Sequence, residues 1–89
     1  MNIKVLGKNI VYLRKKNDIT QLILAEKIGI SRKQLHNYER AKVKNPTCFV
    51  LSQIAMIFNI QQEILDRKDL ELVERNGGNI KLSPLSRTF

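Results

Sequence analysis

Residues 20–40 have the sequence TQLILAEKIGISRKQLHNYER, which predicts two short helices joined by a tight turn. A narrow apolar stripe at positions i, i+1 and i+4 marks the first helix: Leu24, Ala25 and Ile28. Gly29 follows the stripe, and a residue without a Cβ atom readily adopts the left-handed backbone conformation that ends a helix. Ser31 can then cap the second helix, and Gln34, three residues later, can complete a capping box.

The second helix separates two kinds of side chain. Successive residues turn by about 100°, so Leu35 and Tyr38 face the core. The opposite arc holds only cationic, imidazole and amide side chains: Arg32, Lys33, His36, Asn37 and Arg40. Lys and Arg suit phosphates and guanine edges, and Asn can pair with adenine. The pattern favours a DNA-recognition helix over an ordinary solvated charged face.

The charge of the chain indicates an anionic partner. Its 89 residues are enough for one domain and carry a formal net charge of +8. Residues 1–62 contain 11 Lys and Arg and 3 Asp and Glu, whereas residues 63–89 contain 5 of each kind. Because the excess positive charge lies in residues 1–62, this part is expected to meet nucleic acid or a membrane surface.

The sequence gives little support for a membrane or secreted protein, a cysteine-zinc protein or a hydrolytic enzyme. No apolar run approaches the roughly 20 residues that cross a membrane, and residues 1–10 lack the apolar core of a signal peptide. Cys48 is the only cysteine, which excludes an intrachain disulfide and a cysteine zinc cluster. His36 has no carboxylate and hydroxyl spaced to form a hydrolytic triad. We therefore expect a cytoplasmic protein that is not an enzyme and has no metal or cofactor.

Apolar spacing predicts three further helices. They cover about residues 5–16, about residues 46–58 with Pro46 in the first turn, and residues 61–66. The loop before the second of these contains Lys42 and Lys44, which could reach a phosphate backbone.

Some apolar residues exceed what the helical stripes need. Ile57, Ile60 and Ile64 gather where the fourth predicted helix meets the fifth. A cluster of this kind suggests a partner surface. We assign it to a homodimer interface, and ordinary core membership is the alternative.

Residues 67–89 differ in character from the helical part. Apolar and polar residues alternate on both sides of Asn76-Gly77-Gly78-Asn79, the apolar members being Leu70, Leu72, Ile80 and Leu82. Alternation around a Gly-rich turn predicts a β-hairpin or an extended arm, packed on the domain or on a second chain. The alternative is a fifth helix that continues to Glu74 and is followed by a disordered tail.

Residues 6–65 contain LGKNIVYLRKKNDITQ, LAEKIGIS, YER, NP and IAMIFNI. In this order and spacing they resemble the phage-repressor and Cro (XRE) family of helix-turn-helix proteins. The resemblance implies an all-α, compact five-helix DNA-binding domain over residues 1–66, with its helix-turn-helix at about residues 20–40. Residues 67–89 would form a C-terminal extension.

The resemblance also implies roles for single residues. Three match positions that reach base edges in the major groove: Arg32, Lys33 and Asn37. Three match positions that meet the phosphate backbone: Gln21, Arg40 and Lys44. Arg14 and Glu39 match a pair that bridges the first and third helices and orients the recognition helix. As a surface ion pair alone, it would contribute about 0–1 kcal/mol.

The sequence departs from the family pattern in three places. Ala41 stands where a Gly commonly follows the third helix, so the turn is expected to be rebuilt. The loop from Glu39 to Pro46 is one residue longer than usual, which blurs the assignment of its lysines. Leu22 and Ile23 replace polar residues, and they could contact thymine methyls or pack against a neighbour.

These features predict a sequence-specific regulator that binds double-stranded DNA as a homodimer, a repressor on a palindromic operator. An antitoxin that binds DNA through its helical part and a toxin through residues 67–89 is an alternative. The controller protein of a restriction–modification system is another.

Overall fold

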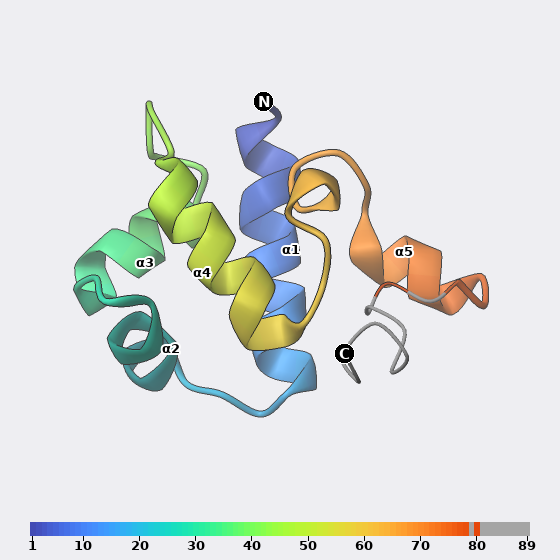
Figure 1. The fold of residues 1–89 in the computed structure, drawn as a ribbon, viewed down its shortest axis with the longest axis horizontal. Helices are drawn as coiled ribbons and strands as arrows, with labels where there is room; N and C mark the ends of the chain where they lie inside the picture. Colours follow the sequence, from blue (N-terminus) through green and yellow to red (C-terminus); the bar gives the residue numbers. More distant parts are fainter. Residues whose placement is uncertain (79, 81–89) are drawn as a thin grey trace, which may run out of the picture.

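The computed structural model describes residues 1–78 and residue 80. Within these residues the ordered elements are helices and one 3₁₀ turn, η1: α1 Ile3–Lys16, α2 Gln21–Ile28, α3 Arg32–Glu39, α4 Cys48–Phe58, η1 Gln62–Ile64 and α5 Leu70–Arg75. Helix α1 lies at the centre, with α2, α3 and α4 on one side of it and α5 on the other (Figure 1). The predicted all-α fold is confirmed. No helix of the described residues is long and apolar enough to cross a membrane.

Local signals in the sequence set the ends of α2 and α3. Thr20 caps α2, and Gly29 ends it in the left-handed conformation with φ 94°. The Ser31 hydroxyl oxygen accepts a hydrogen bond from the backbone N–H of Gln34 at 3.1 Å. In return, the side-chain Oε1 of Gln34 accepts one from the backbone N–H of Ser31 at 2.9 Å. The predicted capping box is therefore present, and it stabilises the start of α3.

One hydrophobic core joins all the elements. Its largest fully buried apolar side chains are Leu6, Ile10, Leu13, Leu24, Ile28, Leu35, Ile54, Leu65 and Leu70. Gly7 lets α1 approach the end of α3, since a Cβ atom there would lie 2.7 Å from the Tyr38 carbonyl oxygen. The core and this close approach fix the position of α3 on the rest of the molecule.

The prediction of a β-hairpin after residue 66 is wrong for the described residues, and Leu82 lies outside them. Leu70–Arg75 is a helix, capped by Asp69 and docked on α1. Asn9 is completely buried on α1, where its Nδ2 donates to the carbonyls of Leu65 and Lys68, both at 2.7 Å. Its Oδ1 accepts from the Leu70 amide at 3.0 Å. The folded unit thus continues past the expected boundary at residue 66.

The corner after α4 also differs from the prediction. Ile60 is only 3% exposed and belongs to the hydrophobic core, the alternative considered above, so it offers almost no surface to the predicted dimer interface. Asn59 turns the chain inward in the left-handed conformation, with φ 57°, and this buries the next side chain. Ile57 and Ile64 are half-buried. The short helix expected at residues 61–66 is η1.

The start of α4 needs a smaller correction. The helix begins at Cys48, and Thr47 caps it by accepting a hydrogen bond from the Val50 amide. Pro46 therefore precedes the cap and does not lie in the first turn.

Candidate nucleic-acid interface

Helix α3 presents a polar face to solvent. Arg32, Lys33, His36 and Arg40 are exposed, and Asn37 is half-buried. On the inner side, Leu35 is completely buried and Tyr38 is 6% exposed. The side chains predicted to contact bases therefore share one accessible surface on an anchored helix.

Glu39 is turned away from that surface and is paired with Arg14 of α1. Arg14 Nε donates to Glu39 Oε2 at 2.7 Å and Nη2 donates to Oε1 at 3.2 Å, while Nη1 donates to the Ile19 carbonyl at 3.2 Å. The side chains are 15% and 4% exposed, so the pair is largely buried and not the surface ion pair considered above. Removing one partner of a buried pair costs about 3–5 kcal/mol, because the other charge is left unpaired.

Gln21 extends this network from α2 to the exposed face of α3. Its Nε2 donates to Glu39 Oε1 at 2.9 Å and lies 3.3 Å from His36 Nδ1. Its Oε1 accepts from Arg32 Nη1 at 3.2 Å. The network thus runs from Arg14 through Glu39 and Gln21 to Arg32, one of the predicted base contacts. The predicted contact of Gln21 with a phosphate stays a prediction, since the structure shows its side chain bonded within the protein.

The loop after α3 adds positive charge beside it. Lys42 and Lys44 are exposed in this loop. Ala41 adopts the left-handed conformation with φ 57°, so the turn keeps this geometry without a glycine. The Lys42 amide donates to the Asn37 carbonyl at 2.9 Å, and Tyr38 Oη accepts from the Thr47 amide at 3.3 Å. These bonds hold both ends of the loop against α3.

Several contacts that sequence reasoning missed hold α5 on α1. The Tyr12 hydroxyl donates to Glu74, and Lys16 pairs with the same carboxylate. The hydrogen bond to Glu74, followed by partial burial, raises the pKa of Tyr12 to about 12. Lys8 pairs with Asp69, which lowers the pKa of the Asp69 carboxyl and raises that of the Lys8 ammonium group. No local spacing could have revealed these contacts, because their partners lie about 60 residues apart.

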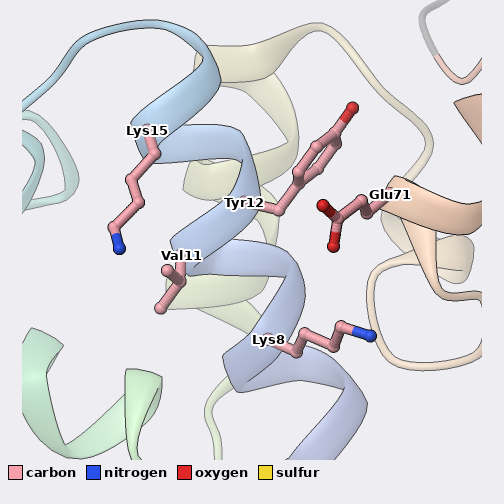
Figure 2. A pocket seen from close by; sticks show the side chains of 5 residues that line it. All are labelled: Lys8, Val11, Tyr12, Lys15 and Glu71. Atoms are coloured by element: carbon pink, nitrogen blue, oxygen red, sulfur yellow. The ribbon is translucent and has the colours of Figure 1, made fainter. Parts of the chain in front are cut away.

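A hollow of about 480 Å³ lies along α1 beside α5 and is lined by Lys8, Val11, Tyr12, Lys15 and Glu71. Figure 2 shows Tyr12 and Glu71 facing each other across the space between the two helices. The lining combines two cations with a carboxylate, and α5 lies on the side of α1 opposite α3 (Figure 1). None of these lining residues belongs to α3 or to the loop that follows it.

A family model described as helix-turn-helix matches residues 10–61 of the chain. Antitoxin PezA of Streptococcus pneumoniae serotype 4 is 32% identical over 99 residues, covering 96% of this chain and 60% of PezA. The ImmF control region 10 kDa protein of Bacillus phage phi105 is 31% identical over 74 residues, covering 83% of this chain and 81% of that protein. The chain thus spans about three fifths of PezA and most of the phage protein.

Two solved DNA-binding domains share the fold. The N-terminal DNA-binding domain of SinR from Bacillus subtilis superposes with a TM-score of 0.67 at 25% identity, covering 73% of this chain and 94% of that domain. The DNA-binding domain of the P22 C2 repressor also gives a TM-score of 0.67, at 27% identity, covering 79% and 91%. The family and the fold are those of DNA-binding regulators and not of enzymes.

Proposed function

Because the chain belongs to the helix-turn-helix family and has the fold of repressor-type DNA-binding domains, we propose that it is a sequence-specific regulator that places α3 in the major groove of duplex DNA. The observation that carries this proposal is the exposed face of α3, which holds cations and an amide. The one carboxylate of α3, Glu39, is turned inward onto Arg14. Such a face attracts phosphates and offers donors to base edges. This activity requires access to DNA, and we assign it to the cytoplasm.

The side chains divide by the part of the DNA they would reach. Arg32, Lys33 and Asn37 lie on α3 and would contact base edges. Cations at the end of α3 and in the following loop would contact phosphates: Arg40, Lys42 and Lys44. Gln21 positions Arg32 through their hydrogen bond at 3.2 Å, and the first turn of α2 would lie against a phosphate.

A homodimer fits this function best. One small domain contacts too few base pairs for high specificity, whereas two copies could occupy successive major grooves about 34 Å apart on a palindromic operator. Half-buried Ile57 and Ile64, at the corner between α4 and η1, remain available for such an interface. Binding would repress transcription by blocking access of the polymerase to the promoter.

A comparison of two variants tests the proposal after duplexes that bind the full chain have been selected from a random library. Asn37→Ala should weaken binding to the selected site by about 1–3 kcal/mol and relax the preference at one base pair. Lys44→Ala, the matched variant at a predicted phosphate contact, should weaken binding to all sequences similarly. It should also reduce the slope of log binding constant against log salt concentration by about one. Equal losses on selected and random DNA for Asn37→Ala would contradict the assigned role.

The similarity to antitoxin PezA supports a second candidate function, in which the chain also neutralises a toxin. Leu72 on α5 is 50% exposed and provides an apolar contact outside the basic surface. Co-expression with the product of the adjacent gene tests this directly. If that product arrests growth and the chain relieves the arrest, whereas Leu72→Asp does not, the antitoxin function holds. A harmless neighbouring product would favour a phage-type regulator, and a neighbouring restriction enzyme would favour a controller protein.

A further inference from the structure

Leu22 and Ile23 are large apolar side chains that stay exposed in the first turn of α2. They are 54% and 46% exposed, and within residues 20–40 no other large apolar side chain reaches this exposure. Neither belongs to the hydrophobic core or to the half-buried residues packed against it. Their apolar character is therefore not required by the packing among residues 1–78 and 80.

The position of Gln21 shows which of the two lies near the recognition helix. Its side chain bonds to Arg32 and Glu39 of α3 at 3.2 Å and 2.9 Å, so this side of α2 faces α3. At about 100° per residue, Leu22 is turned by about 100° from Gln21 and Ile23 by about 200°. Leu22 therefore points closer to the α3-facing side of α2 than Ile23, which points away from α3.

The chemistry of Leu22 limits what it can contact on DNA. A leucine side chain forms no hydrogen bond with a phosphate or with the polar edge of a base. The apolar group that a base edge presents in the major groove is the thymine C5-methyl. The cations and the amide on the exposed face of α3 offer donors for guanine and adenine but little apolar surface.

We propose that Leu22 packs against the C5-methyl group of a thymine beside the base pair contacted by Arg32, and that it is a specificity-determining residue of this interface. The inference rests on the proposed DNA-binding function and adds to it a base preference supplied from α2.

The test removes single methyl groups from the DNA. A high-affinity duplex is first selected with the full chain, and each thymine is then replaced in turn by deoxyuridine, which lacks only the C5-methyl. Loss of one buried methyl contact should weaken binding of the wild-type chain by about three- to fourfold at one thymine position in each half-site. Replacements at other thymines should have little effect.

Two variants show whether Leu22 is responsible. In Leu22→Ala, replacement of the sensitive thymine should cause no further loss. Ile23→Ala is the matched control, because Ile23 is also an exposed apolar residue of the same turn but lies on the far side, and it should keep the wild-type response. Both residues are exposed, so the melting temperatures of the two variants should match that of the wild type.

The outcomes separate the inference from the function on which it rests. If the full chain selects no sequence, the proposed function fails and the inference fails with it. If a sequence is selected but no thymine is sensitive, or Leu22→Ala remains as sensitive as the wild type, only the inference is overturned. If Leu22→Ala instead weakens self-association of the DNA-free chain in sedimentation, Leu22 contacts a second copy and the inference is wrong.

Discussion

Ala41 holds a backbone conformation that residues other than Gly, Asn and Asp rarely adopt. Its φ is 57°, and alanine lacks a polar side chain that could offset the cost by a local hydrogen bond. Ala41→Gly should therefore raise the free energy of unfolding by about 1 kcal/mol. Urea denaturation of the two proteins measures the difference.

Lys42→Gly is the matched control for this substitution. Lys42 lies in the same loop, but its φ is not positive, so glycine relieves no strain there and adds flexibility to the unfolded chain. This variant should be slightly less stable than the wild type. An unchanged or lowered stability of Ala41→Gly would show that the turn carries no strain.

Glu39 is the residue at which the burial of an ion pair matters most. Its side chain is 4% exposed and bonds to both Arg14 and Gln21. Glu39→Gln leaves the Arg14 guanidinium largely buried without its counter-charge, and the free energy of unfolding should fall by about 3 kcal/mol. Thermal or urea denaturation at neutral pH provides the measurement.

An exposed ion pair of the same chain serves as the comparison. Glu71 and Arg75 pair at 3.3 Å on α5 with side chains 44% and 68% exposed. Glu71→Gln should change the free energy of unfolding by less than about 1 kcal/mol, because water already screens both charges. Similar losses for the two variants would mean that burial of the Arg14–Glu39 pair has no energetic consequence.

At the scale of elements, the sequence predicts best where local chemistry decides. Gly29 and the Ser31–Gln34 box define the turn between α2 and α3, and both act within a few residues. The docking of α5 could not be predicted in this way, since Asn9 bonds to groups 56 to 61 residues later. Helix α5 also has only 6 residues, less than two turns, and in so short a segment helical and alternating patterns are hard to distinguish.

The candidate site shows the same division. The helical periodicity of α3 correctly separates buried Leu35 and Tyr38 from the polar face, because this separation depends on the sequence of a single helix. The hydrogen bond between Gln21 and Arg32 depends on how two helices are rotated about each other, which only the packed structure reveals. The burial of Glu39 likewise depends on α1, α2 and α3 meeting at one place.

The docking of α5 on α1 is expected to depend on pH. A hydrogen bond from Lys8, followed by one from the Leu72 amide, lowers the pKa of the Asp69 carboxyl below its ordinary value of 3.8. A carboxyl with a lowered pKa in the folded state contributes stability above its unfolded pKa, and this stability is lost as the pH falls through the folded pKa. Asp69→Asn, which can still cap α5, should therefore be less stable than the wild type at neutral pH, and the difference should shrink below pH 3.8 and vanish below the lowered pKa of Asp69.

Urea denaturation of both proteins across this range tests the dependence. Lys8→Met removes the other partner and should abolish the part of the pH dependence that the pair supplies. A stability difference between Asp69→Asn and the wild type that stays constant into acid would show that the charge of Asp69 does not matter.

At the scale of the described molecule, acidic residues after position 62 neutralise part of the positive charge of α1. The acidic residues after position 62 all lie between residues 63 and 74, and two of them neutralise lysines of α1 through the pairs Lys8–Asp69 and Lys16–Glu74. Helix α5 therefore reduces the positive potential on its side of α1 (Figure 1). The surface formed by α3 and the following loop keeps its positive potential, and this favours one orientation of the molecule toward DNA.

The folded unit includes α5, and truncation tests this. A chain ending at residue 66 loses Leu70, which is completely buried, and two of the three groups that bond to buried Asn9. Lost burial of one leucine costs about 1.5–3 kcal/mol, and unpaired buried amide groups cost about 1–3 kcal/mol more. This chain should therefore melt well below the wild type. A chain ending at residue 80 keeps every one of these groups together with Ile80, which is 6% exposed, and it should melt well above the chain ending at residue 66. Equal melting temperatures for the two truncated chains would place α5 outside the cooperative unit, whereas a loss confined to the shorter chain makes residues 67–80 part of the domain that presents α3.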